Sequence, residues 1–277
     1  MQRFRSMLFA PGNKSELLKK LPKIQPDAAI VDLEDAVPNE EKENARKNFQ
    51  EFTGSEQTKD LAVFPRVNPI SSTHFELDIQ ALPAEVDCVV IPKISSLEEL
   101  KEAEKILSQN NVGRKIIVGI ETVLGVLSAT EILSSTSVIA AYFGAEDYVL
   151  DLGGFRTTDN DEVFLARSQM GMASRLSGVP VIDQIVTDFS DDERFTNEAY
   201  QARALGFSGK LCIHPSQVPL ANQSFSYSQE EVNRAKELLA VYDLAISQGS
   251  ASAVYDGKMI DEALAKQARR ILEAQTD

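Results

Sequence analysis

The chain has 277 residues, which is long enough for one α/β barrel or for two domains of average size. Its hydrophobic content of 43% and its charged content of 25% are those of an ordinary globular protein. The formal net charge of −14 argues against nucleic acid and anionic membrane surfaces as partners. An anionic small substrate would then need a local positive charge or a metal ion to offset this field.

The amino-terminal segment predicts no secretory leader, because Pro11 and Gly12 interrupt the first apolar run. No apolar stretch approaches the roughly 20 residues that a membrane-spanning helix needs. Cys88 and Cys212 both lie within apolar runs, which favours buried thiols in a reducing compartment over a disulfide or a metal site. We therefore expect a cytoplasmic protein.

Short apolar runs alternate with helical patterns along the first four-fifths of the chain. The runs are residues 6–11, 28–34, 61–66, 87–93, 115–121, 138–147, 180–185 and 209–215. Helical patterns follow at residues 15–21, 40–52, 75–82, 96–108, 123–133, 161–176 and 191–205. Runs this apolar, without alternation, are typical of parallel strands that helices cover on both faces. Eight such units predict a single (β/α)8 (TIM) barrel over residues 1–226, with an open doubly wound sheet as the alternative.

Local signals refine two of these units, and a tail follows the last. Ser96 suits the N-cap of the helix at 96–108, with Glu98 and Glu99 in its first turn. After Gly144 we expect an acidic loop.

Residues 227–277 are predicted to form a helical extension, with helices at 229–247 and after Asp261. Because the barrel is complete before this tail, we expect it to pack outside the barrel or against a neighbouring subunit.

Charged residues end several of the runs. Glu121 and Asp147 stand at or just past the ends of two of them, and Arg66 ends a third. The carboxyl ends of parallel strands meet at one edge, where α/β folds place their active sites. Two acids favour binding of a hard cation, Mg²⁺ or Mn²⁺, and an arginine beside them favours binding of a carboxylate ligand. The other strand-end residues are Pro11, Glu34, Asp35, Lys93, Asp183 and His214.

Other cofactors find less support. His74 and His214 lie far apart and show no ligand spacing, which disfavours zinc and copper. The chain has no Gly-x-Gly-x-x-Gly or P-loop pattern, so a nucleotide-binding motif is not supported.

Each candidate also has a structural interpretation. An acid at a strand end can cap the next helix, as Glu121 with Thr122 could. Lys93 could form a Schiff base, although an acid pair that holds a metal makes an imine redundant. Arg66 could simply pair with Asp32, Glu34 or Asp35. An arginine that ends an apolar strand is nevertheless costly to bury without a ligand, so the three groups together favour function.

Several blocks of residues form a further pattern, in order along nearly the whole chain. They are residues 5–12, 32–37, 66–68, 119–122, 143–147, 152–153, 212–215 and 257–261. Together they resemble the citrate lyase beta-subunit-like family. The resemblance implies a Mg²⁺-dependent (β/α)8 barrel that cleaves or forms carbon–carbon bonds in 3-hydroxyacyl thioesters such as malyl-CoA, citramalyl-CoA or citryl thioesters.

The resemblance also implies roles for residues at matching positions. Glu121 and Asp147 would bind Mg²⁺, and Arg66 would bind the carbonyl and carboxylate oxygens of the substrate. Asp261 would enter the site of a neighbouring subunit as acid or base, because the family usually forms homotrimers or hexamers built as dimers of trimers. The implied partners are an acyl-CoA and a small 2-oxo acid such as glyoxylate, pyruvate or oxaloacetate.

Further substrate contacts are expected at the same edge, from Glu121, Glu34 and Asp35. Arg5 and Lys14, near the first strand, are cationic candidates for the CoA pocket. Asp261 has a structural alternative as the N-cap of the last helix, and the proline that often follows this aspartate in the family is absent here.

Three other functions stay open. The chain could be the beta subunit of a citrate lyase that acts on citryl-acyl carrier protein. It could be a metal-dependent, pyruvate-type aldolase that takes a free 2-oxo acid. It could also be a metabolite-binding protein that has lost catalysis.

Overall fold

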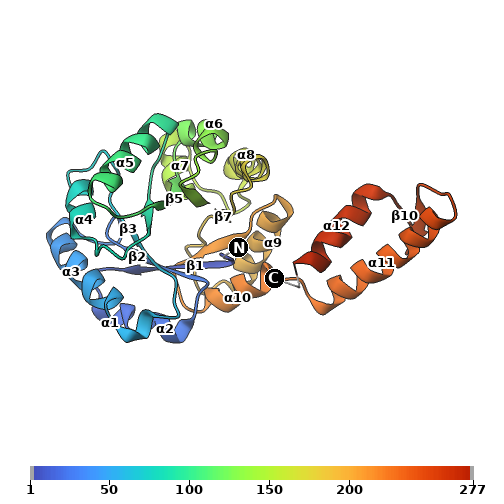
Figure 1. Ribbon diagram of the computed structural model, residues 1–277, viewed down its shortest axis with the longest axis horizontal. Coiled ribbons are helices and arrows are strands. Elements are labelled where there is room, and N and C mark those ends of the chain that lie inside the picture. The colour runs from blue at the N-terminus through green and yellow to red at the C-terminus, as the bar shows by residue number, and fades with distance from the viewer. Residues whose placement is uncertain (1–2, 275–277) are drawn as a thin grey trace. The chain divides into compact units, whose positions relative to one another are not determined.

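The computed structural model describes residues 3–274, except for the side chain of Gln57 (Figure 1). The described residues form two compact units, residues 3–225 and residues 226–274. Among the described residues, no helix is long and apolar enough to cross a membrane.

The larger unit is a closed barrel of eight parallel strands that pair in chain order. The strands are β1 Ser6–Pro11, β2 Ala28–Asp32, β3 Val63–Arg66, β4 Cys88–Ile91, β5 Lys115–Ile120, β6 Val138–Phe143, β7 Val181–Asp183 and β8 Gly209–Cys212. Pairing of β1 with β8 closes the barrel. The predicted (β/α)8 barrel is thus confirmed, and the open sheet is excluded.

Helices cover the outside of the barrel. They are α1 Ser15–Leu18, α2 Leu21–Ile24, α3 Lys42–Thr53, α4 Phe75–Ala81, α5 Leu97–Gln109, α6 Val123–Ile132, α7 Ala145–Leu152, α8 Asp161–Ser177, α9 Asp192–Ala204 and α10 Gln217–Ser224. Alternate strand residues pack inside the barrel, for example Ile30, Val90 and Tyr142, and the others pack under the helices. Inward-pointing residues at the carboxyl ends of the strands therefore face one another across that end of the barrel.

The structure differs from the expectations in three places. The acidic segment after Gly144 is helix α7, and it ends at Gly153, whose φ of 76° is in the left-handed region. The pattern at 15–21 is two short helices, because Pro22 stands in the first turn of α2. Helix α10 was not expected at all. By contrast, Ser96 does cap α5, since its side chain accepts a hydrogen bond from the Glu99 amide.

The smaller unit contains α11 Gln229–Ser247, strands β9 Ala253–Tyr255 and β10 Lys258–Ile260, and α12 Glu262–Glu273. The two strands form an antiparallel hairpin. Ser228 and Glu231 make a reciprocal capping box at the start of α11. Tyr242, Ile260 and Ala265 form a small core of their own, which holds the helices and the hairpin together.

Candidate active site

Arg66 lies at the end of β3, beside Asp32 at the end of β2. The two residues are partners in the strand register, so their side chains share a face. The Arg66 guanidinium donates two hydrogen bonds of 2.7 Å to the Asp32 carboxylate, one from Nε and one from Nη2. Asp32 is 1% exposed. Burial alone would raise the pKa of Asp32, but Arg66 outweighs it and lowers that pKa.

Glu34 connects this pair to Lys93, which follows β4. Its Oε2 lies 3.2 Å from Arg66 Nη1, and its Oε1 accepts a 2.7 Å hydrogen bond from Lys93 Nζ. Lys93 Nζ also lies 3.1 Å from Asp35 and 3.6 Å from Asp147. The predicted residues Arg66, Glu34, Asp35 and Asp147 are therefore joined by ion pairs at one edge of the barrel.

Two features of this edge are typical of functional sites. Glu34 is buried, and its Oε2 makes the ion pair with Arg66 but no hydrogen bond among the described residues. Burial raises the pKa of Glu34 in spite of Arg66 and Lys93. Lys93 itself has a φ of 60°, a conformation that non-glycine residues rarely adopt and that clusters at functional sites.

Lys93 is not poised to act as an imine-forming nucleophile. Burial alone would lower the pKa of Lys93, but Glu34 and Asp35 outweigh it and raise that pKa above its ordinary value. A Schiff-base lysine needs the opposite shift, so that the amine is neutral. The ammonium instead organises the acids around it.

Glu121 directly follows β5 and is 2% exposed. The hydroxyl of Tyr142, on β6, donates a hydrogen bond to Glu121 Oε1. Glycines make room for this carboxylate. A Cβ at Gly119 would lie 2.4 Å from Glu121 Oε1, and a Cβ at Gly144 would lie 2.7 Å from its Cγ. The alternative role of Glu121 as a cap does not occur, because Thr122 caps α6.

Burial raises the pKa of Glu121 to about 8, against the opposing effects of Arg66 and the Tyr142 hydrogen bond. The negative charges of Glu34 and Asp147 raise it further. A bound cation would offset the charge of these carboxylates.

The pair Glu121 and Asp147 fits a magnesium ion. Tyr142 occupies only one oxygen of Glu121, and Asp147, in the first turn of α7, is partly exposed. The described residues contain no cluster of three or more candidate ligands. Mg²⁺ suits such a sparse set, because it commonly takes one or two carboxylates and completes its shell with water and substrate oxygens.

Aromatic rings lie against this charged edge inside the barrel. The Arg66 guanidinium lies 4.7 Å from the centroid of the Phe9 ring. Phe9 in turn meets Tyr142 edge to face, with ring centroids 6.1 Å apart. The charges therefore face apolar packing on one side, which strengthens their electrostatic interactions.

A buried lysine fixes the loop that carries Glu34. Lys42, on α3, is 5% exposed, and its Nζ donates to the backbone carbonyls of Leu33 and Glu34 at 2.9 and 3.0 Å. Neither this role nor that of Tyr142 was predicted. The sequence offers one signal for Tyr142. It is the only residue of β6 with a polar group in its side chain, and it lies two residues before Gly144.

Arg5 is not brought to this edge. It precedes β1 and therefore lies at the amino-terminal end of the barrel, where it pairs with Asp27 at 2.8 Å. The expected grouping of Arg5 with Lys14 near a CoA pocket does not hold. Lys14 follows β1, is exposed, and lies on the loop at the carboxyl edge.

Asp261 caps α12, as its structural interpretation predicted. Its Oδ1 accepts hydrogen bonds from the amides of Ala263 and Leu264 at 3.0 and 3.2 Å. Both hydrogen bonds use the same oxygen, so the cap leaves Oδ2 outside this interaction.

Two other strand-end residues have structural partners. Asp183 is fully buried and pairs with Arg167 and Lys210. His214 hydrogen-bonds Ser216 and stacks on Phe189, with ring centroids 4.7 Å apart.

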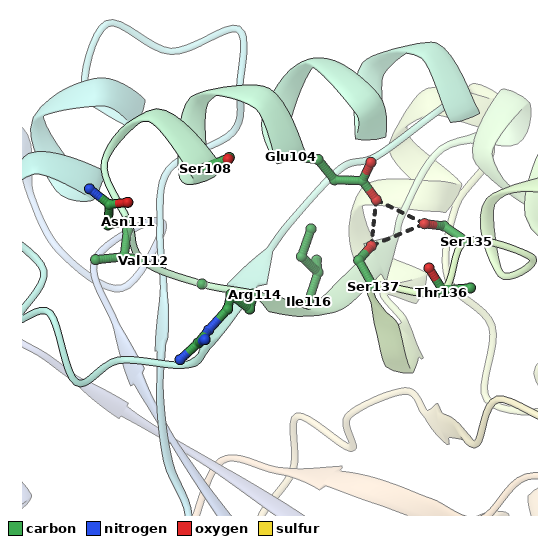
Figure 2. A pocket seen from close by; sticks show the side chains of 10 residues that line it. Glu104, Ser108, Asn111, Val112, Arg114, Ile116, Ser135, Thr136 and Ser137 are labelled. Carbon is green, nitrogen blue, oxygen red and sulfur yellow. Dashed lines mark hydrogen bonds between the residues drawn. The ribbon is translucent and has the colours of Figure 1, made fainter.

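A cavity of about 550 Å³ lies at the amino-terminal ends of β5 and β6. Figure 2 shows the Glu104 carboxylate hydrogen-bonded to the hydroxyls of Ser135 and Ser137 in its lining. Barrel enzymes carry their chemistry at the other edge. This cavity is therefore separate from the candidate site.

Comparisons with known proteins show which family this chain resembles. The family model described as HpcH/HpaI aldolase/citrate lyase matches residues 5–215. The citrate lyase subunit beta-like protein of Deinococcus radiodurans is 43% identical, over 97% of this chain and 96% of that protein. The mitochondrial citramalyl-CoA lyase of Mus musculus is 29% identical, over 98% of this chain and 86% of that protein.

A solved structure extends the likeness to both units. It is the CitE protein of Mycobacterium tuberculosis in complex with magnesium, acetoacetate and coenzyme A. That structure is 27% identical, covers 99% of each chain and gives a TM-score of 0.85. The chain belongs to the HpcH/HpaI aldolase/citrate lyase family.

Proposed function

We propose that this protein is a cytoplasmic, Mg²⁺-dependent carbon–carbon lyase that acts on a 3-hydroxyacyl-CoA such as malyl-CoA, citramalyl-CoA or citryl-CoA. The observation that carries the proposal is the buried carboxylate Glu121, which lies at the same barrel edge as the ion-paired residues Arg66, Glu34, Lys93 and Asp147. Relatives that act on citramalyl-CoA or bind magnesium and coenzyme A support it.

Glu121 and Asp147 are the proposed magnesium ligands. When bound there, the ion would polarise the carboxylate and hydroxyl of the substrate and lower the pKa of that hydroxyl. A 2-oxo acid product, such as glyoxylate, pyruvate or oxaloacetate, carries the same kind of oxygen donors.

Arg66 is the proposed electrostatic catalyst. Cleavage of the carbon–carbon bond leaves negative charge on the thioester oxygen of the departing enolate. A guanidinium held by Asp32 is already oriented, so it donates to that oxygen without first losing side-chain freedom. One such donor is worth about 3 kcal/mol in the transition state.

The remaining residues have supporting roles in the proposal. Glu34 and Asp35 contact the substrate, and Lys14 faces the CoA. Asp261 of a neighbouring copy supplies or accepts a proton through the oxygen that the cap leaves outside its hydrogen bonds, in a homotrimer or hexamer.

The test is a panel of malyl-, citramalyl- and citryl-CoA, assayed on the isolated chain with and without Mg²⁺. Glu121→Gln and Asp147→Asn should each lower kcat/KM at least about 100-fold, because each removes a proposed metal ligand. Glu43→Gln, on the exposed face of α3, is the matched control and should change nothing. Intact metal-dependent cleavage in both site variants would overturn the proposal.

The same panel separates the other functions. A citrate lyase beta subunit would co-elute with partner chains and would need citryl-acyl carrier protein. A pyruvate-type aldolase would turn over free 2-oxo acids without any thioester. A binding protein would take up the ligand in a Mg²⁺-dependent manner, show no turnover, and tolerate Asp261→Ala.

A further inference from the structure

Asp78 is a fully buried acid on a helix that covers the barrel. It lies in α4, which connects β3 to β4, and is 0% exposed. Helix positions that face a core are normally apolar, as Phe75 and Ile79 are in the same helix. A buried ion pair often adds no net stability over apolar packing, so Asp78 is better explained by what it holds in place.

Both oxygens of Asp78 bind other parts of the chain. Its Oδ1 accepts a 2.7 Å hydrogen bond from Nε of Arg46, on α3. Its Oδ2 accepts two hydrogen bonds from Asn68, one from the backbone amide at 2.7 Å and one from the side-chain amide at 2.6 Å. Asp78 therefore fixes both the backbone and the side chain of Asn68, while Arg46 compensates its buried charge.

Asn68 extends this contact to a second loop. It lies two residues after Arg66, in the loop that follows β3, and is 4% exposed. Its side-chain nitrogen also donates to the backbone carbonyl of Leu33 at 2.9 Å, in the loop that follows β2. A side-chain amide has two N–H groups, and here one is directed at Asp78 and the other at Leu33. The Asn68 side chain therefore links the loops after β2 and β3.

The residues next to these loops orient Arg66. Asp32, at the end of β2, binds the guanidinium through both carboxylate oxygens, and Glu34 pairs with it from the loop after β2. The backbone amide of Leu33 donates to the carbonyl of Arg66 at 2.9 Å. The spacing between the two loops therefore sets where the guanidinium lies. A displacement of about 1 Å in a reacting group can lower a rate by about 100-fold.

We propose that Asp78 and Asn68 are positioning residues for the guanidinium of Arg66. Asp78 holds Asn68, Asn68 holds the carbonyl of Leu33, and the two loops so joined hold Arg66 against Asp32. The inference rests on the proposed role of Arg66 in catalysis, but the geometry that it concerns can be measured without turnover.

The first test follows the Nε–H group of Arg66 by NMR. In the wild type this proton lies in a 2.7 Å hydrogen bond to buried Asp32, so it should exchange slowly with water. Asn68→Ala keeps the backbone hydrogen bond to Asp78 but removes the link to Leu33. The variant should therefore exchange the Arg66 proton roughly 10-fold faster or more.

Gln217→Ala is the matched control for this experiment. Gln217 is also buried, and its side-chain nitrogen donates to the carbonyl of Val186, in the loop after β7. The control removes the same kind of contact from a loop that does not adjoin β2 or β3. Exchange of the Arg66 proton should stay within about twofold of the wild type. Equal exchange rates in Asn68→Ala and the control would overturn the proposal.

The second test is a double-mutant cycle on turnover of the hydroxyacyl-CoA substrate. Asn68→Ala alone should lower kcat by about 10–100-fold. Arg66→Lys by itself removes the paired hydrogen bonds to Asp32, so adding Asn68→Ala to it should lower kcat by less than about threefold more. Fully additive losses would mean that Asn68 supports the fold in general and does not act through Arg66, which would also overturn the proposal.

The two tests separate this inference from the proposed function. If the wild type cleaves no hydroxyacyl-CoA, the proposed function fails, and proton exchange still decides the positioning role. If Asn68→Ala does not fold, Asp78→Asn takes its place in both tests. It keeps the size of the side chain but turns an amide nitrogen towards Arg46 or Asn68, which are themselves donors. It should give the same faster exchange and non-additive loss, and wild-type exchange in this variant would refute the inference.

Discussion

Tyr142 is a single residue on which the geometry of Glu121 depends. Its hydroxyl donates a hydrogen bond to one carboxylate oxygen, and Gly119 and Gly144 leave room beside the carboxylate that a Cβ would fill. Tyr142→Phe should lower Mg²⁺ affinity and kcat/KM by about 10–100-fold, as expected for a residue that orients a metal ligand. Calorimetric Mg²⁺ titration measures the first effect independently of turnover.

The matched control for this change is Tyr148→Phe. Tyr148 is also buried, but its ring packs on Phe143 and its hydroxyl does not contact Glu121. This variant should bind Mg²⁺ within about twofold of the wild type, since it removes no contact to a ligand. Equal affinities for all three proteins would contradict the positioning role.

Glu121 also predicts how metal binding depends on pH. Because burial raises its pKa to about 8, the carboxyl of the metal-free protein is mostly protonated at neutral pH. A metal must then displace this proton, so apparent Mg²⁺ affinity should rise by up to roughly tenfold per pH unit between pH 6 and 8, and level off above. Calorimetry in two buffers of different ionisation enthalpy would detect the released proton. A flat affinity across this range would contradict the prediction.

The sequence predicts the site residues at the strand ends, but it does not predict those whose role depends on how side chains are oriented in the fold. Arg66, Glu121 and Asp147 end or follow apolar runs, and this places them at one barrel edge once the strands are parallel. Tyr142 lies in mid-strand, so its role depends on which face of the pleat it occupies. Lys42 acts on a loop that precedes its own helix, a contact that no local pattern predicts.

Helix α12 raises a question at the scale of elements, because Asp261 both caps it and is the proposed proton carrier. Asparagine caps helices about as well as aspartate but holds no exchangeable carboxyl proton. Asp261→Asn should therefore keep thermal stability and lose about 10²–10⁴-fold in kcat, whereas Asp261→Ala should also lose about 1 kcal/mol of stability. Thermal unfolding together with steady-state kinetics separates the two effects. Full activity of the asparagine variant would remove Asp261 from the mechanism.

Elements were predictable where one signal dominated. The barrel strands are evident because short, continuous apolar runs are typical of buried parallel strands. The predicted runs extend past several strands, because their last, polar residues belong to the following loops. The sequence does not distinguish helix α7 from the expected acidic loop, because the helix is short, and acidic residues also suit the first turn of a helix. Helix α10 is not evident from the sequence, because it is short and has Pro219 in its first turn, where proline is tolerated.

At the scale of the whole molecule, a buried ionic cluster joins β7 and β8 to the helices that cover them. Asp183 accepts hydrogen bonds from Arg167 at 2.9 Å and Lys210 at 2.7 Å, and Lys210 lies 3.4 Å from Glu198. All four residues are at most 3% exposed. Burying a charge is costly unless it is paired. Any rearrangement of β7, β8 or their helices that separates these residues would therefore leave an unpaired buried charge.

Lys210→Met tests how much this cluster contributes to stability. It leaves Asp183 and Glu198 without their shared cation, and it should lower the free energy of unfolding by about 3–5 kcal/mol in urea at neutral pH. Lys47→Met removes one partner of an exposed pair and should cost at most about 0.5 kcal/mol.

The deficit of the Lys210→Met variant should depend on pH in a defined direction. Burial alone would raise the pKa of Glu198, but Lys210 and hydrogen bonds lower it to about 2. A lowered acid pKa stabilises the folded state above the ordinary value of 4.5, and this contribution is lost as pH falls towards 2. The difference between wild type and variant should therefore shrink as pH falls through this window. A deficit that stays constant would mean that Lys210 acts through packing, for example against the Phe195 ring 5.6 Å away, and not through its charge.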